Sequence, residues 1–95
     1  FGAVGTCGQR CTSTRRIIVH ESIYNAVVSR LVNIYEKLPI GNPLEEGKLV
    51  GPLIDKDAVR NFTEALAEAT RSGGRVLTGG EVLTGAGYET GTYVK

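Results

Sequence analysis

Two stripes of apolar residues at helical spacing constrain the fold of this chain more than any other feature. The first stripe lies between Glu21 and Leu38 and ends before Pro39. Its members recur three or four residues apart: Ile23, Val27, Leu31 and Ile34. The second stripe follows Asp55, a residue type that caps helix N-termini, and ends at Gly73–Gly74. Its members are Val59, Phe62, Leu66 and Ala69. Each stripe predicts one face of an amphipathic helix.

Three shorter segments predict β-strands. Arg16–His20 contains a β-branched run typical of a buried strand, Arg75–Thr78 is a second candidate, and a third begins at Thr92. The predicted order is strand, helix, helix, strand, strand, which is an α/β fold. Short helices are marginal on their own, so their apolar stripes need a sheet, and these strands offer only a narrow one. We therefore expect an incomplete sheet within one partial domain, residues 1–95.

The composition argues against several classes of protein. The formal net charge is +1, and the first twenty residues hold Arg10, Arg15 and Arg16 without any acidic residue. Elsewhere the basic residues are matched by nearby carboxylates, whereas a nucleic-acid-binding protein more often has a long basic face, so we expect no nucleic-acid partner. No apolar run approaches the roughly 20 residues that cross a bilayer, and we expect no membrane partner. We expect both ends, Phe1 and Lys95, to be cut from a longer chain.

The segment Gly5–Thr12 has a composition that packing does not easily explain, because it holds two glycines and two cysteines in eight residues. Cys7 and Cys11 are separated by three residues, which is not the spacing of zinc or redox pairs, and no second pair follows. We expect no metal and free thiols, and hence a reducing compartment, the cytoplasm or the mitochondrion. A cationic neighbourhood favours a reactive thiolate. The residues alone leave open whether these thiols are reactive or buried, and which one reacts.

The same segment carries a resemblance to a known family. Gly8–Cys11 resembles the Gly-Gln-x-Cys motif around the nucleophile of the aldehyde dehydrogenase superfamily, and Phe1–Gly5 looks like the helix that delivers it. Further matches follow in the order of that family, at Gly41–Pro43, Gly51–Leu53 and Gly79–Gly80. The resemblance covers essentially the whole chain. It implies a fragment of the catalytic domain of an aldehyde dehydrogenase.

Two further segments, Thr14–Arg16 and His20–Ser22, look similar to the antiquitin branch of the superfamily, which oxidises α-aminoadipic semialdehyde with NAD. The resemblance implies that Cys11 is the catalytic nucleophile. Its thiolate would attack the aldehyde, hydride would pass from the thiohemiacetal to the nicotinamide, and water would hydrolyse the thioester. The backbone N–H of Cys11 would be one oxyanion donor. Arg10 would bind the carboxylate of the substrate.

The resemblance also implies that most of the enzyme lies outside this chain. The second oxyanion donor of the family is an asparagine, its base is a glutamate, and its cofactor-binding and oligomerisation regions are separate; none has a counterpart in residues 1–95. The full-length protein would bind NAD and a small aldehyde and would form a dimer or tetramer. This segment would be inactive alone.

Other interpretations remain open. The chain could be a non-catalytic truncated homologue that acts only in assembly, or a cysteine hydrolase in which His20 activates Cys11. The predicted strand between these two residues argues against local contact, so we expect His20 to be structural. Arg10 could be an ordinary surface arginine. Cys7 could fill an alanine-sized space, which we favour, or be oxidised onto Cys11.

Overall fold

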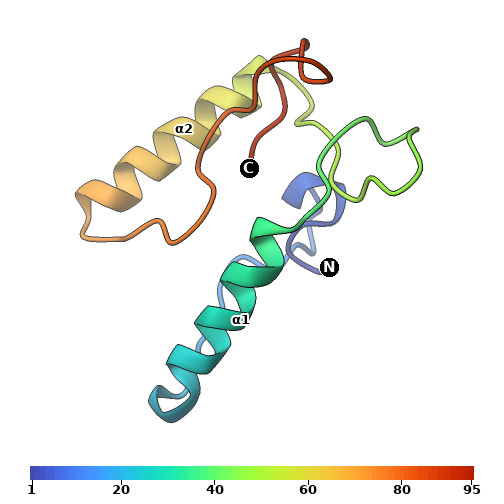
Figure 1. The fold of residues 1–95 in the computed structure, drawn as a ribbon. Coiled ribbons are helices and arrows are strands. Elements are labelled where there is room, and N and C mark those ends of the chain that lie inside the picture. Colours follow the sequence, from blue (N-terminus) through green and yellow to red (C-terminus); the bar gives the residue numbers. More distant parts are fainter.

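Two α-helices and two short 3₁₀ turns are joined by irregular segments in the computed structural model, which describes residues 1–95 (Figure 1). The first 3₁₀ turn, η1, is Gly5–Gly8, and the second, η2, is Glu21–Ile23. Helix α1 is Tyr24–Glu36 and helix α2 is Lys56–Arg71. The radius of gyration is 14.1 Å, larger than the ~13 Å of a compact domain of 100 residues. The chain is therefore more open than a self-contained domain of its length.

The first predicted helix is confirmed, with a 3₁₀ turn at its start. His20 caps this turn, because its Nδ1 accepts a hydrogen bond from the Ser22 N–H at 3.2 Å. The helix ends at Glu36, shortly before Pro39, whose ring and missing N–H do not fit a helix interior. No residue of α1 is buried, and 57% of Ile34 is exposed. The apolar face of α1 is thus formed but only partly covered, since Val27 and Leu31 are of intermediate exposure.

The second predicted helix is confirmed at both ends. Asp55 adopts an extended backbone, and its Oδ1 accepts a hydrogen bond of 2.8 Å from the Ala58 N–H, which satisfies one of the free donors of the first turn. Gly73 follows the last turn with φ +91°, a left-handed conformation that glycine adopts without strain. No residue of α2 is buried either.

The predicted strand order is not confirmed. The β pairing consists of two isolated bridges, Ile40 with Val50 in parallel and Val82 with Val94 antiparallel. Residues 15–20 are unpaired, and Ile18 is fully exposed. A β-branched run forms a ladder only when a partner strand is present to accept and donate its backbone hydrogen bonds, and no segment of this chain occupies that place.

A small core lies where the connection between α1 and α2 meets the C-terminal segment. Ile40, Val50 and Tyr93 form it, each less than 9% exposed. Tyr88 packs edge-on against Tyr93, with ring centroids 5.2 Å apart, and its hydroxyl donates to the Ile40 carbonyl at 3.2 Å. Leu53 is buried beside this region, and its N–H donates to the Thr92 carbonyl at 2.8 Å. Irregular segments, rather than helices, therefore supply the buried residues.

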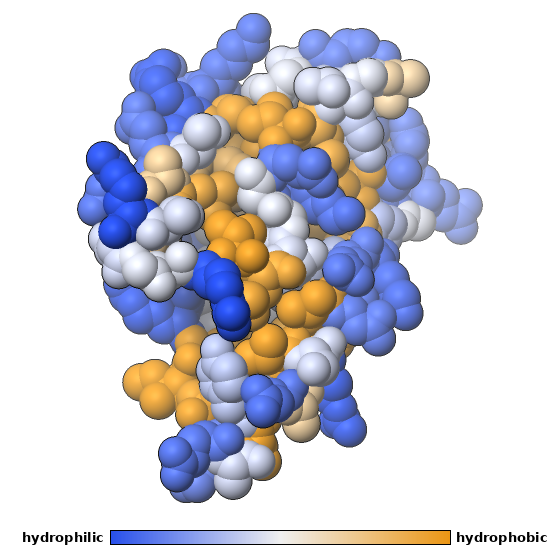
Figure 2. Space-filling model, turned by 60° about the vertical axis from the view of Figure 1, so that its left-hand side comes forward, coloured by the Kyte–Doolittle hydropathy of each residue, from blue (hydrophilic) through white to orange (hydrophobic).

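The two helices do not pack against each other (Figure 1). A hollow of about 460 Å³ lies between their facing side chains, which include Leu31 and Leu66. Figure 2 shows apolar residues running across one face of the molecule between charged ones. Several large apolar side chains are at least half exposed: Phe1, Ile17, Ile18, Ile23, Ile34, Leu44 and Ile54. Of the two apolar stripes, Ile23, Ile34 and Ala69 are exposed, and the other members are only partly buried.

Candidate active site

Cys11 lies at the tip of a tight turn. The Ser13 N–H donates to the Arg10 carbonyl at 3.2 Å, which closes the turn, and the Arg10 N–H donates to Ser13 Oγ at 3.1 Å. Ser13 is buried at the base of this turn, whereas Cys11 and Thr12 are exposed. The backbone N–H of Cys11 makes no hydrogen bond within the chain. A thiol and a free backbone donor are thus presented together at the surface.

Arg15, which follows the turn in sequence, forms hydrogen bonds to two of its backbone carbonyl groups. Its Nη1 donates to the Ser13 carbonyl at 2.9 Å and its Nη2 donates to the Arg10 carbonyl at 3.1 Å. Neither bond involves a carboxylate, so the guanidinium keeps its positive charge unpaired beside the turn. Of the basic cluster that the sequence indicated, Arg15 is therefore the member whose side chain contacts the backbone of the turn.

The backbone before this turn is left-handed. Thr6 and Cys7 have φ angles of 54° and 53°, and Gly8 has φ 70°. Only glycine adopts this region freely, so two consecutive residues with side chains there are unusual. The helix expected over Phe1–Gly5 is consequently absent: residues 2–4 form a turn and η1 is distorted. That prediction was wrong because a left-handed pair cannot continue a right-handed helix.

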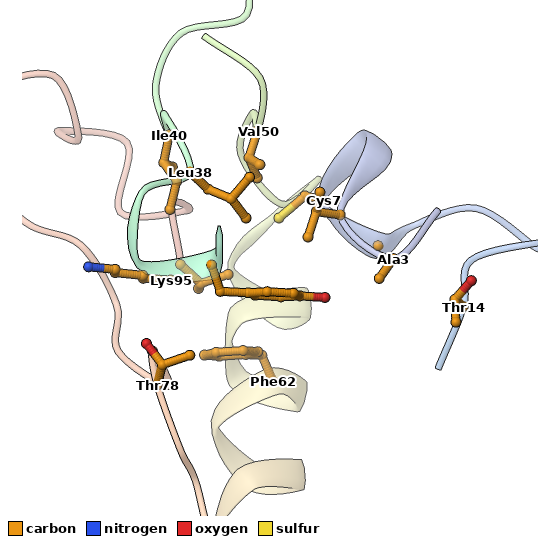
Figure 3. Close-up of a pocket in the computed structure, with 14 residues that line it drawn as sticks. Ala3, Cys7, Thr14, Leu38, Ile40, Val50, Phe62, Thr78 and Lys95 are labelled. Carbon is orange, nitrogen blue, oxygen red and sulfur yellow. The ribbon is translucent and has the colours of Figure 1, made fainter. Parts of the chain in front are cut away.

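Cys7 is turned inward by this conformation. Figure 3 shows it with Leu38, Ile40 and Val50 around an apolar cavity of about 290 Å³. The side chain is half-buried against the core, and burial raises the pKa of the Cys7 thiol. Both cysteines are free, as expected. The geometry agrees with Cys7 as a small packing residue, and Cys11 does not line this cavity.

Arg10 is folded back over the loop. Its Nε donates to Thr6 Oγ1 at 2.9 Å, and its guanidinium carbon lies 5.4 Å from the centre of the Phe1 ring. A Cβ at Gly5 would approach this guanidinium to 3.2 Å, so the glycine makes room for it. The two terminal nitrogens of Arg10 make no hydrogen bond within the chain. The substrate-binding role of Arg10 stays a prediction.

Gln9 was not singled out by the sequence, yet it links the turn to a distant segment. Its Oε1 accepts from the Ile54 N–H at 2.9 Å, and its Nε2 faces the Pro52 carbonyl at 3.4 Å. Gln9 belongs to one family motif, Gly8–Cys11, and its partners lie in or next to another, Gly51–Leu53. The sequence shows both motifs, but no local pattern reveals that they lie side by side.

The hydrolase interpretation finds no geometric support. The ring of His20 is engaged with Ser22, its Nδ1 lying 2.8 Å from Ser22 Oγ, and it makes no hydrogen bond to Cys11. His20 is therefore a capping residue. No group of three His, Cys, Asp or Glu side chains could hold a metal ion, and no helix is long and apolar enough to cross a membrane.

The residues present do not form a dinucleotide cradle. Such a cradle needs a glycine loop between a strand and the N-terminus of a helix. Gly73–Gly74 follows the end of α2, and Gly79–Gly80 leads into an irregular segment. These glycines serve turns, and Gly80 lies against the Val76 and Leu66 side chains.

Comparison with known proteins gives one family. Residues 1–95 match the model of the aldehyde dehydrogenase family. Aldehyde dehydrogenase family 7 member A1 of Pisum sativum is 51% identical over 78 residues, which are 82% of this chain and 15% of that protein. Alpha-aminoadipic semialdehyde dehydrogenase of Rattus norvegicus is 51% identical over 77 residues, 81% of this chain and 14% of that protein. The chain therefore spans about a seventh of the length of these relatives.

Solved structures give the same grouping. The structure of 3,6-anhydro-L-galactose dehydrogenase in complex with NAP matches with a TM-score of 0.87 and 30% identity, over 94% of this chain and 19% of that one. The structure of lactaldehyde dehydrogenase from Escherichia coli matches with a TM-score of 0.82 and 34% identity, over 90% of this chain and 18% of that one. The open arrangement of the two helices is thus one that occurs within much larger chains.

Proposed function

The chain belongs to the aldehyde dehydrogenase family, and from this membership we propose that it is the nucleophile-bearing segment of an enzyme that oxidises an aldehyde to a carboxylic acid. The observation that carries the proposal is the presentation of Cys11. Its side chain is exposed at the tip of a braced turn, within the Gly-Gln-x-Cys motif, while Cys7 is half-buried in apolar surroundings. Of the two thiols, Cys11 is the more exposed to an aldehyde from solvent.

The chemistry assigned to Cys11 follows from its two reactive groups. Its thiolate would add to the carbonyl carbon of the aldehyde, and the carbonyl π electrons would move to oxygen, giving a thiohemiacetal anion. The free N–H of Cys11 would donate to this oxyanion. Loss of a hydride from the same carbon would give a thioester, and water would release the acid and regenerate the thiol. The aldehyde loses two electrons as the hydride departs.

We propose NAD as the acceptor of that hydride, a role supported by the likeness to a dehydrogenase in complex with NAP, which is an NAD(P) cofactor. Because residues 1–95 form no dinucleotide cradle, sequence outside this chain would bind it, and no step through NAD is assigned to the residues described. The same outside sequence would supply the catalytic base and the second oxyanion donor.

The proposed substrate is α-aminoadipic semialdehyde, on which the rat relative acts by its name. This molecule carries a carboxylate at the end opposite its aldehyde, and the unused terminal nitrogens of Arg10 offer a matching cation one residue from the nucleophile. We further propose that the full-length protein is a dimer or tetramer in the cytoplasm or the mitochondrion.

The test is NADH formation by the full-length protein from the semialdehyde and from an aliphatic aldehyde of similar length. We expect Cys11→Ser to lower kcat/KM by more than about 10³-fold on both substrates, because the hydroxyl is a far weaker nucleophile. Cys7→Ser serves as the matched control and should stay within about threefold of wild type, since surface or partly buried packing changes are small. Activity that survives in Cys11→Ser would refute the assignment.

Arg10 is tested with the same assay. Loss of a charge-assisted hydrogen bond costs about 1.5–3 kcal/mol, so we expect Arg10→Ala to lower kcat/KM for the semialdehyde about 10- to 100-fold. The aliphatic aldehyde, which has no carboxylate, should be affected much less. Equal losses on both aldehydes would assign Arg10 to the loop instead of the substrate.

A further inference from the structure

We propose that Gln9 is a positioning residue that holds the nucleophile turn against the segment Pro52–Ile54, an inference that rests on the proposed role of Cys11. The primary amide of Gln9 carries one acceptor and two donors. Its Oε1 accepts from the Ile54 N–H at 2.9 Å, and its Nε2 donates to the Thr6 carbonyl at 3.0 Å and faces the Pro52 carbonyl at 3.4 Å. The side chain is thus hydrogen-bonded both to its own loop, at Thr6, and to the segment Pro52–Ile54.

No other hydrogen bond performs this task. The remaining hydrogen bonds of residues 1–15 stay within that segment, such as Thr14 N–H to the Gly2 carbonyl and the two bonds of Arg15. Those of Gln9 are the only ones that join residues 1–15 to later parts of the chain. The turn is hydrogen-bonded internally, and Gln9 is its only hydrogen-bonded anchor to the rest of the chain, beside the packing of Val4 and Cys7 against the core.

The receiving segment is itself fixed. Leu53, between the two partners of Gln9, is buried, and its N–H donates to the Thr92 carbonyl at 2.8 Å. A continuous set of contacts therefore runs from the C-terminal segment through Leu53 to Gln9 and then to the turn. Because Gln9 immediately precedes Arg10, any rotation of the turn about this anchor moves the Cys11 thiol and its backbone N–H together.

A positioning role has a kinetic signature. The thiol must approach the aldehyde carbon while the N–H points at the oxygen, and a displacement of about 1 Å in such an arrangement costs on the order of 10²-fold in rate. Binding of the substrate before reaction depends much less on this alignment. A change at Gln9 should therefore lower kcat and leave KM nearly unchanged.

The decisive experiment measures kcat and KM of the full-length enzyme with three variants. Gln9→Met keeps the length of the side chain and removes every hydrogen bond, and we expect kcat to fall about 10²-fold with KM within about twofold. Gln9→Glu keeps an acceptor for the Ile54 N–H, but it replaces the Nε2 donor with an oxygen that faces the Thr6 and Pro52 carbonyl oxygens, so kcat should fall as well. Asn42→Leu is the matched control: it also removes an amide that bonds backbone, Oδ1 to the Leu44 N–H at 3.0 Å, and should retain wild-type kcat.

Thiol labelling separates positioning from unfolding. Iodoacetamide should still modify Cys11 in Gln9→Met, while Cys7 stays protected as in wild type. If Gln9→Met does not fold, Gln9→Glu carries the test, with an expected loss of at least about tenfold in kcat. A kcat equal to that of Asn42→Leu, or a rise in KM with kcat unchanged, would overturn the proposal. Failure of the nucleophile assignment is distinct, because Cys11→Ser would then remain active.

Discussion

Cys7 and Cys11 are four residues apart, yet they occupy opposite kinds of site. Cys7 lies in a left-handed stretch that turns its thiol toward the apolar core, whereas Cys11 lies on a hydrogen-bonded turn that presents its thiol to solvent. The two cysteines share one short segment of sequence. Backbone conformation therefore separates the thiol that packs against the core from the thiol that is exposed.

The largest expected difference between the two sites is in thiol reactivity. In the folded full-length protein at neutral pH, iodoacetamide should modify Cys11 at least about tenfold faster than Cys7, because Cys11 is exposed whereas burial raises the pKa of the Cys7 thiol. Peptide mapping by mass spectrometry gives the two rates. In denaturant the rates should converge. Equal rates in the folded protein would contradict the inward orientation of Cys7.

The next effect concerns the strained backbone. Cys7→Val should destabilise the folded protein by about 1–3 kcal/mol, since a β-branched residue is poorly tolerated at positive φ. Cys11 has no positive φ, so Cys11→Val is the matched control and should change stability by less than about 0.5 kcal/mol. Thermal unfolding followed by circular dichroism measures both. A similar loss in the two variants would remove backbone strain as the explanation.

A smaller effect of opposite sign is expected at Thr6. Asparagine populates the left-handed region more readily than threonine and retains an oxygen that can accept from Arg10 Nε. Thr6→Asn should therefore stabilise the protein by roughly 0.5 kcal/mol. The same thermal unfolding assay detects it as a raised midpoint. Destabilisation would mean that the methyl group of Thr6 contributes packing that outweighs the strain.

The smallest effect is on the pH dependence of stability. Burial raises the pKa of Cys7 in the folded state, so the unfolded state loses its proton first as the pH rises. Stability associated with the neutral thiol is complete below the unfolded pKa and is lost as the pH passes toward the raised folded pKa. Cys7→Ala should thus show a shallower alkaline decline in Tm than wild type when thermal unfolding is followed at several alkaline pH values.

Local signals predicted the helices well and the loop poorly. The cap at Asp55 and the glycine at Gly73 act on neighbouring backbone, so sequence order alone was sufficient to place α2. The run at Ile17–Val19 has the composition of a strand, but a strand needs a partner that is not part of its own sequence. Its pairing could not be predicted from these residues.

In the candidate site, too, some features could be predicted from the sequence and others could not. The motif around Cys11 was visible in the sequence, and so were the nearby arginines, although the contacts of Arg15 with two carbonyl groups were not. The left-handed pair at Thr6 and Cys7 carries no sequence signal, because neither residue type favours that conformation. The contact of Gln9 with Ile54 depends on how the chain folds back between them, which no local pattern specifies.

That contact also sets an order of events during synthesis. Gln9 and Ile54 are separated by 45 residues, and at about 5–20 residues per second the ribosome makes the second roughly 2–9 s after the first. Local structure such as α1 can form in the interval, while a contact between residues so distant must first meet the entropy of closing the loop. We expect the turn that carries Cys11 to reach its working position late, well after the cysteine itself has been made.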